Sequence, residues 1–224
     1  MSPPNPSSAT SKSTLRRKLR SARRALTPSQ QHAHAKSLTQ NTLQTLLTLR
    51  FRRFALYLAA DGEINTWPLI NKLLSLNLLV GLPCLHRNVP RQRPLHLKMY
   101  FAPFTSGTTL VRGHYDLLEP RCPRSQHPGV SPIFVPDVVF TPLVGFDRSG
   151  NRLGMGGGFY DRYNNPLERS KPALRIGLAH ELQHLTSVSS AETLPVDAWD
   201  KPLDGVITEQ RVHGFSTRGK LCLT

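Results

Sequence analysis

Hydrophobic positions near the start of the chain recur at the spacing of two helices. Between residues 12 and 26, leucine or alanine returns every three or four positions among arginines and lysines, which predicts a helix with one apolar stripe on a strongly basic surface. The T-P-S-Q segment at 27–30 then supplies a cap, a proline for the first helical position and a glutamine at the third, so a second helix is predicted to run to about Thr48. The fold is therefore expected to open with two basic helices.

Farther along, short apolar runs alternate with helix signals. Residues 54–58 and 78–82 are predicted strands, and between them Thr66 caps a helix with apolar residues at 69, 70, 73 and 74. This order implies a parallel pair of strands joined by a crossover helix. Later strands are predicted over 95–101, 138–144, 174–179 and 205–208, with loops over 87–94 and 120–132. The pattern predicts an α/β fold of three layers, with a mostly parallel sheet, helices on both faces and ligands beyond the carboxyl ends of the strands.

Composition agrees with one folded domain. The chain has 224 residues, of which 38% are hydrophobic, enough for one medium-sized core. The Pro/Ser-rich residues 1–11 are expected to form a disordered arm, and residues 12–224 a single domain without internal repeats. The best candidate for a membrane span, residues 73–85, is interrupted by polar residues and proline and is shorter than the roughly 20 apolar residues that a span requires. A membrane protein is therefore not expected.

The charge of the chain indicates which ligands it attracts, and its cysteine content indicates the cellular compartment. Residues 1–60 hold eleven Lys and Arg and no acidic residue, so they carry most of the net charge of +15 and should attract nucleic acid or small polyanions. An acid-free start also resembles a transit peptide, but three prolines within the first six residues break its first turns. Three cysteines without a C-x-x-C pair fit neither a disulfide framework nor a thiolate zinc site. We expect a cytoplasmic monomer.

The candidate ligand-binding residues are most concentrated in a glycine-rich segment. Five of the 15 glycines fall between positions 150 and 158, where a strand turns and a helix is predicted to begin at about Gly158. Consecutive glycines allow close backbone approach to a ligand, and a helix start favours anions, so the segment is interpreted as a phosphate cradle with Arg152 and Asp161 beside it. A flexible turn that binds nothing is the alternative. The segment matches neither the Walker loop nor the full G-x-G-x-x-G pattern, which disfavours P-loop enzymes and Rossmann dehydrogenases.

The same segment carries a family resemblance. Residues 142–162, P-L-V-G-F-D-R-S-G-N-R-L-G-M-G-G-G-F-Y-D-R, resemble the signature of the 5-formyltetrahydrofolate cyclo-ligases, also called methenyltetrahydrofolate synthetases. The similarity extends to K-S-T-L-R at 12–16, to residues 56–64 and to residues 194–208. The chain departs from the family at Met155 and Gly157, where some members carry a basic residue, and over residues 87–132.

The resemblance implies an ATP-dependent cyclisation that requires Mg²⁺. The formyl oxygen of 5-formyltetrahydrofolate attacks the γ-phosphate of ATP, N10 closes on the activated carbon, and phosphate leaves to give 5,10-methenyltetrahydrofolate. The implied catalytic residues are Arg152 and Tyr160, and the implied metal ligands are Asp161 and Asp200. The implied ATP contacts are Lys12, Arg16, Arg152, Leu153, Gly154, Met155, Gly156, Gly157, Gly158, Phe159 and Tyr160. The implied folate contacts are Leu58, Glu63, Met155, Gly156, Gly157, Gly158 and Phe159.

Two other functions remain as alternatives. His180-Glu181-Leu182-Gln183-His184 is a literal H-E-x-x-H, the zinc-hydrolase pattern, but a strand is predicted to end at His180 and no third-ligand signature follows. The segment also resembles the family's I-G-L-A-x-x-x-Q. The basic start would suit a nucleic-acid-binding module, but aromatic residues are only 7% and are not interleaved with the basic stretch, so no stacking platform is predicted. We therefore expect no specific nucleic-acid partner.

Overall fold

The structure is a computed structural model that describes residues 11–46, 51–85, 99–121, 134–163, 172–187 and 193–223. The predicted arm lies outside these ranges except for Ser11, whose hydroxyl accepts a hydrogen bond from the Thr14 amide and caps the first helix. The predicted loop over 87–94 and most of that over 120–132 also lie outside the described residues. In the described part of the chain, no helix is both long enough and apolar enough to cross a membrane.

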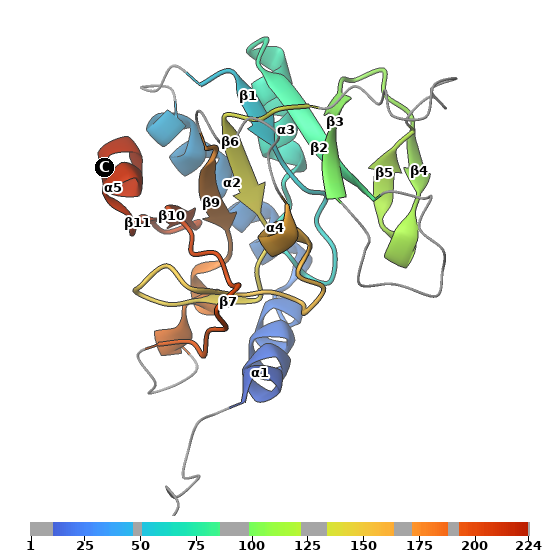
Figure 1. The fold of residues 1–224 in the computed structure, drawn as a ribbon. Helices are drawn as coiled ribbons and strands as arrows, with labels where there is room; N and C mark the ends of the chain where they lie inside the picture. The colour runs from blue at the N-terminus through green and yellow to red at the C-terminus, as the bar shows by residue number, and fades with distance from the viewer. Residues whose placement is uncertain are drawn as a thin grey trace, which may run out of the picture.

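Seven strands form one mixed sheet, in the order β11-β10-β9-β6-β1-β2-β3 (Figure 1). The five inner strands are parallel, and the two edge strands, β11 and β3, run antiparallel to their neighbours. The prediction of a mostly parallel sheet is confirmed. The strands are β1 (Arg53–Ala55), β2 (Leu79–Leu85), β3 (Met99–Phe104), β6 (Val138–Thr141), β9 (Leu174–Leu178), β10 (Gly205–Ile207) and β11 (Val212–Gly214).

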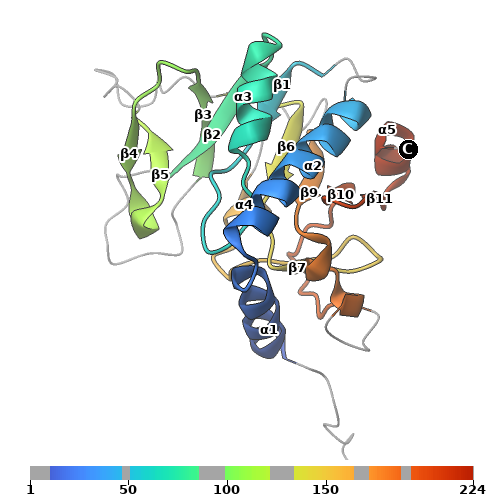
Figure 2. The same cartoon turned by 180° about the vertical axis from the view of Figure 1, so that it is seen from behind.

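Helices lie on both faces of this sheet. Figure 2 shows α2 (Pro28–Leu46) and α3 (Trp67–Ser75) on one face, whereas α4 (Phe159–Arg162) lies on the face seen in Figure 1. Helix α5 (Thr217–Leu223) packs against β11 and α2. Helix α1 (Lys12–Arg24) crosses below the sheet, at the end where the loops after β6 and β9 emerge. Strand β6 is buried at all four residues because both of its faces are covered.

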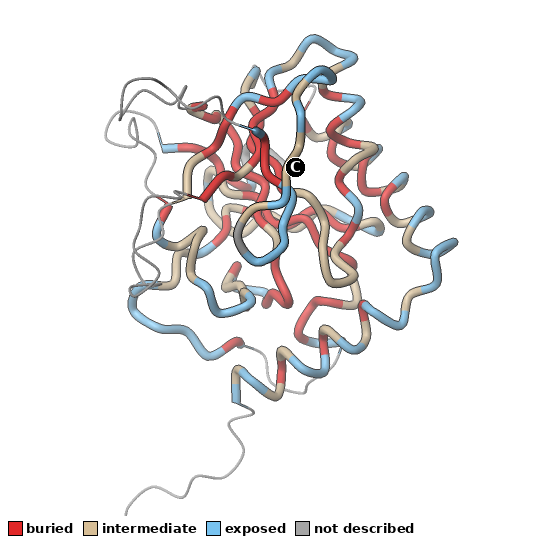
Figure 3. Tube along the Cα trace, turned by 90° about the vertical axis from the view of Figure 1, so that its right-hand side faces the viewer, coloured by how far each residue is buried: buried red, intermediate tan, exposed pale blue. Residues whose placement is uncertain are grey.

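The alternation of side chains along β6 divides the core between the two faces. Val138 and Phe140 pack with Leu69 and Ile70 of α3, and Val139 packs on the opposite face with Phe101. Figure 3 shows how burial concentrates in the central strands while the outer surfaces of the helices stay exposed. The period of two in a strand therefore produces two apolar layers, one on each side of the sheet.

Several boundaries differ from the prediction. Strand β1 ends at Ala55, three residues before the predicted end, because residues 56–58, of which only Leu56 and Tyr57 are buried, pair with no strand as part of β1. Helix α1 ends at Arg24 rather than near Leu26, and α2 carries Lys36 as its one Lys or Arg, so only α1 is strongly basic. The sequence also missed two hairpins, β4 (Leu110–Arg112) with β5 (Leu118–Pro120), and β7 (Gly145–Phe146) with β8 (Arg152–Leu153). Both are too short to carry a periodic signal.

Candidate active site

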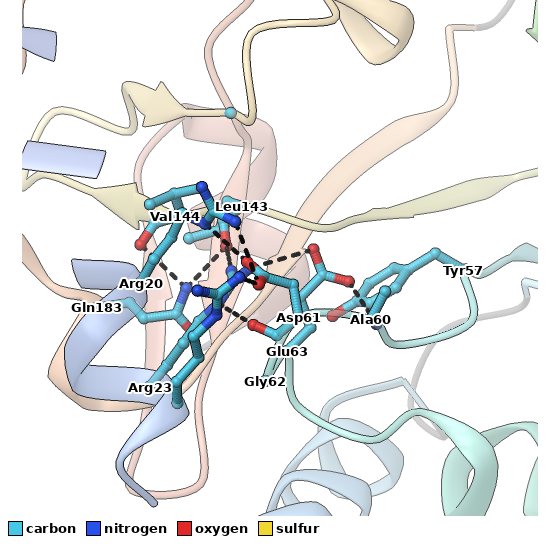
Figure 4. A network of polar contacts seen from close by, with 12 residues as sticks. Arg20, Arg23, Tyr57, Ala60, Asp61, Gly62, Glu63, Leu143, Val144 and Gln183 are labelled. Atoms are coloured by element: carbon cyan, nitrogen blue, oxygen red, sulfur yellow. Dashed lines mark hydrogen bonds and ion pairs between the residues drawn. The ribbon is translucent and has the colours of Figure 1, made fainter. Parts of the chain in front are cut away.

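The loops that follow β1 and β6 meet under α1 through a buried arginine. Arg23 is fully buried and donates to the Asp61 carboxylate at 2.8 Å, to the Asp61 carbonyl at 2.9 Å and to the Leu143 carbonyl at 3.0 Å (Figure 4). Arg20 and Arg24 also pair with the Asp61 carboxylate. We call these four side chains, Arg20, Arg23, Arg24 and Asp61, the arginine clamp. The clamp fixes α1 to both loops.

Sequence reasoning missed the arginine clamp and predicted only an apolar stripe on a strongly basic helix. The available signal was that Asp61 is the first acidic residue after eleven cations. The backbone also determines where the Asp61 side chain lies, because Asp61 and Gly62 have φ of 54° and 74° and form a tight left-handed turn. The turn directs the Asp61 carboxylate back toward α1.

Glu63 lies directly after this turn and faces two tyrosines. It is largely buried, its Oε2 accepts the Ala60 amide at 3.1 Å, and its Oε1 is 3.8 Å from Arg23. Burial raises the pKa of Glu63, while the Ala60 amide and Arg23 act in the opposite direction. Burial and the Glu63 charge raise the pKa of both Tyr57 and Tyr160 well above the ordinary tyrosine range. The predicted folate residue Glu63 and the predicted catalytic residue Tyr160 are therefore neighbours.

The glycine loop faces open space at Gly154 and Gly156, whereas side chains of Phe159 and Arg162 lie over Gly157 and Gly158. A Cβ placed on Gly154 or Gly156 would meet no atom within 4 Å, and Gly156 has φ of 101°. The Gly154 carbonyl accepts the Arg16 guanidinium at 2.8 Å, which joins α1 to the loop. Helix α4 starts after Gly158 as predicted but has only four residues, so its dipole is smaller than that of a full helix.

The remaining loop residues differ in what their side chains offer. Met155 is 52% exposed, whereas Leu153 is 2% exposed and packs in the core against α1, so only the Leu153 backbone could contact a ligand. The Phe159 ring makes an edge contact with Tyr115, a 64% exposed residue between β4 and β5 that the sequence analysis did not single out. Leu58 is half-buried and packs on the main core. The loop therefore combines an open backbone with an aromatic rim.

The predicted phosphate-binding cations pair with the predicted metal ligands. The Arg152 guanidinium donates to Asp161 at 2.5 Å, and the Lys12 ammonium donates to Asp200 at 2.9 Å. Lys201 links the two pairs, because its carbonyl accepts from Arg152 at 2.9 Å and its amide donates to Asp161 at 3.3 Å. Lys12 also contacts Asp197 at 2.7 Å.

The two carboxylates suit a hard cation. Burial acts to raise the pKa of Asp200, but the Asp197 amide and the Lys12 ammonium lower it by more. Asp200 is therefore ionised at neutral pH. Within the described ranges, neither Asp161 nor Asp200 belongs to a group of three metal-ligating side chains. Mg²⁺ needs only one or two carboxylates when substrate phosphates and water complete its shell. The donor set therefore fits magnesium bound together with a nucleotide.

The H-E-x-x-H segment does not form a zinc-hydrolase helix. Glu181–Gln183 is a single 3₁₀ turn, and His184 after it is extended. The His180 ring contacts His34, with 2.9 Å between their Nδ1 atoms, whereas the His184 ring contacts Thr186. Burial, with the neighbouring His34, lowers the pKa of His180 to about 4. The two histidines face different partners, as the predicted strand end at His180 implied.

The basic surface of α1 forms an open hollow without aromatic side chains. Its volume is about 610 Å³. Arg20 and Arg24 on its wall are already paired with Asp61, which reduces the local positive charge. The hollow therefore lacks a stacking platform for bases. It is lined by Ser13, Arg16, Arg17, Arg20, Ser21, Arg24 and Ala25.

Comparison with known proteins gives one consistent result. The model of the 5-formyltetrahydrofolate cyclo-ligase family matches residues 8–209. A 5-formyltetrahydrofolate cyclo-ligase of Haemophilus influenzae is 36% identical over 193 residues, which cover 86% of this chain and 95% of that protein. The enzyme of the same name from Escherichia coli K12 is 34% identical over 201 residues, covering 87% and 98%. The solved Aquifex aeolicus 5,10-methenyltetrahydrofolate synthetase superposes with a TM-score of 0.68 at 27% identity, covering 91% of this chain and 92% of the other.

Proposed function

The chain belongs to the 5-formyltetrahydrofolate cyclo-ligase family and is a ligase, and from that premise we propose that it converts 5-formyltetrahydrofolate and Mg²⁺-ATP to 5,10-methenyltetrahydrofolate, ADP and phosphate. One observation carries the proposal. Helix α1 joins the residues assigned to the two substrates, because Arg16 donates to the Gly154 carbonyl of the glycine loop at 2.8 Å and Arg23 lies 3.8 Å from Glu63. The same helix therefore holds the proposed folate and ATP residues beside each other, as a reaction between the two substrates requires.

The folate side is built around Glu63. Its carboxylate oxygens accept hydrogen bonds, as the N–H groups of a pterin ring require, and its low exposure excludes competing water. Phe159 and the exposed Tyr115 form an aromatic edge pair at the glycine loop, suited to a flat ring system. We assign the pterin to Glu63 and to this pair.

The nucleotide side is built from the open glycine loop and three cations. Gly154 and Gly156 leave space for close approach of phosphate groups, and Arg152, Lys12 and Arg16 supply positive charge. We propose that phosphate replaces the carboxylates as partner of Arg152 and Lys12. Asp161 and Asp200 then become available to hold Mg²⁺, which neutralises phosphate charge when bound. The ion pairs of the structure thus keep both sets of groups in place.

The proposed reaction needs positioning more than a side-chain nucleophile. The formyl oxygen bonds to the γ-phosphorus as the bond to ADP breaks. N10 then bonds to the formyl carbon and loses its proton to water, and phosphate leaves with the oxygen. Arg152 is placed to stabilise charge on the transferred phosphoryl group. The raised pKa of Tyr160 keeps its hydroxyl protonated, so it can donate a hydrogen bond but does not act as a base.

The test is a direct assay of the coupled reaction. Mixing the protein with 5-formyltetrahydrofolate, ATP and Mg²⁺ should produce methenyltetrahydrofolate absorbance and one ADP per product, and ATP consumption should stop when the folate is omitted. Equal ATP turnover without the folate, or no absorbance change, would contradict the proposal. Arg152→Ala should slow turnover by about ten- to a hundredfold, because a charge-assisted contact to phosphate contributes roughly 1.5–3 kcal/mol.

A further inference from the structure

Three side chains that the proposed reaction does not use converge from separate parts of the chain. His34 lies on α2, His180 follows β9 and Glu209 follows β10, and a ligand atom of each lies within 4.8 Å of those of the other two. The Nδ1 atoms of the two histidines are 2.9 Å apart, and the Glu209 Oε1 is 3.8 Å from the His34 Nδ1. Two imidazole nitrogens and one carboxylate oxygen therefore face one small volume.

We propose that these three side chains form a binding site for a divalent transition metal ion, for which Zn²⁺ is the best match. Tetrahedral zinc, with bonds of about 2.0–2.1 Å, separates neighbouring ligand atoms by about 3.3 Å, a value between the two distances observed. The His34–His180 separation would have to grow by about 0.4 Å and the His34–Glu209 separation to shrink by about 0.5 Å, while the His180 and Glu209 ligand atoms start within 4.8 Å of each other. Two histidines and one carboxylate are a zinc ligand set, and the fourth position is left to water.

Contacts outside the cluster hold the ligands in place. The second oxygen of Glu209, Oε2, accepts the Glu181 amide at 2.9 Å, which leaves Oε1 on the side of His34. Asn41 of α2 donates to the Thr208 carbonyl at 2.9 Å and so fixes the helix that carries His34 against the residue before Glu209. Such outer contacts orient metal ligands and lower the cost of assembling them.

Burial and charge favour a borderline metal over a hard one. His180 is fully buried, Glu209 is 8% exposed and His34 is 23% exposed, so the cluster is nearly dry with access beside His34. The nearby positive charge of Arg23 opposes a cation at His180, but the ion pair of Arg23 with Asp61 offsets that charge. Nitrogen ligands suit zinc, copper or nickel rather than Mg²⁺, which prefers oxygen. The site is therefore distinct in chemistry from the Asp161 and Asp200 pair.

The test is metal binding by full-length, chelator-treated protein in the absence of folate and nucleotide, so its outcome is independent of the proposed function. Titration with ZnCl₂ by calorimetry should show one saturable site, and Co²⁺ should give the visible absorption of a nitrogen- and oxygen-coordinated ion. His34→Gln and Glu209→Gln should each weaken zinc binding by about tenfold or more. His32→Gln is the matched control, because His32 is exposed on the same helix and lies outside the cluster.

Several outcomes would overturn the site. These are the absence of saturable zinc binding by the parent protein, equal zinc affinity in His34→Gln and the parent, or a weakening by His32→Gln as large as that by His34→Gln. Mg²⁺ at millimolar concentration should not displace Co²⁺, and displacement would count against nitrogen coordination. Circular dichroism checks that both variants fold, and either folded variant alone suffices because His34 and Glu209 belong to different elements.

Discussion

At the scale of single residues, the site depends on carboxylates that have two possible partners. Asp161 and Asp200 are bonded to Arg152 and Lys12, yet the proposed reaction needs both carboxylates for magnesium. The family resemblance identified both carboxylates and both cations as candidate site residues. No sequence pattern indicated that the cations and carboxylates would pair with each other. Pairing of this kind depends on side-chain distances that only the folded loops determine.

We therefore expect Asp161→Asn and Asp200→Asn each to raise the Mg²⁺ concentration needed for half-maximal activity by about tenfold or more, since the amide lacks the charge that a hard cation prefers. The measurement is initial rate against Mg²⁺ at saturating ATP. Asp137→Asn is the control, because Asp137 precedes β6, at the opposite end of the sheet from the site, and pairs with Arg53. A variant with the Mg²⁺ dependence of the parent would remove that residue from the proposed ligand set.

The glycine loop gives a second prediction at the residue scale. The φ of 101° at Gly156 is strained for any other residue, so Gly156→Ala should cost about 1–3 kcal/mol in this loop conformation and weaken ATP binding by about fivefold or more. Gly107→Ala is the control, because a Cβ there meets only Thr105, at 4.0 Å. Calorimetric titration with ATP compares the two variants. Unchanged affinity in a folded Gly156→Ala protein would contradict the phosphate-cradle interpretation.

At the scale of elements, the sequence predicted the order of helices and strands better than their connections. The β1–α3–β2 crossover was predicted because apolar runs and a helix cap are local signals. The arginine clamp was not predicted, because its partners, α1 and the Asp61 turn, are far apart in the sequence. Burial of Arg23 has no signature in the sequence, since Arg23 belongs to a run of arginines of which most are exposed or half-exposed.

Removal of the buried guanidinium should therefore destabilise the whole domain. Arg23→Met removes donors to the Asp61 carboxylate, the Asp61 carbonyl and the Leu143 carbonyl. Because Arg20 and Arg24 still pair with Asp61 and Gln183 still donates to Leu143, we expect a cost of about 1–3 kcal/mol in the free energy of unfolding. Arg17→Met, on the exposed side of the same helix, should change it by less than about 0.5 kcal/mol. Urea unfolding followed by circular dichroism measures both. Similar midpoints for Arg23→Met and the parent would show that the clamp does not stabilise the fold.

At the scale of the whole molecule, the sheet places three predicted site segments toward one end, whereas α4 with Tyr160 lies on a face of the sheet and Asp200 precedes β10. Glu63 follows β1, the glycine loop follows β6, and α1 brings its cations over both. The proposed location of the site follows the general rule that ligands bind beyond the carboxyl ends of parallel strands. The rule could not indicate that the β4–β5 hairpin would bring Tyr115 to Phe159, because strands of three residues carry no periodic signal in the sequence.

The net charge of +15 leads to the last prediction, which separates an enzyme with a basic surface from a nucleic-acid-binding protein. If duplex DNA contacts only the four arginines that line the hollow on α1, neutralising about four phosphates, its affinity should fall by about a hundredfold between 50 and 200 mM salt. Arg17→Gln should lower the slope of log K against log salt by about 0.9, without dependence on DNA sequence. Fluorescence anisotropy with two unrelated duplexes measures both quantities. Tight binding that persists at 200 mM salt and prefers one duplex would instead support a nucleic-acid function, because simple charge attraction supplies neither salt resistance nor sequence preference.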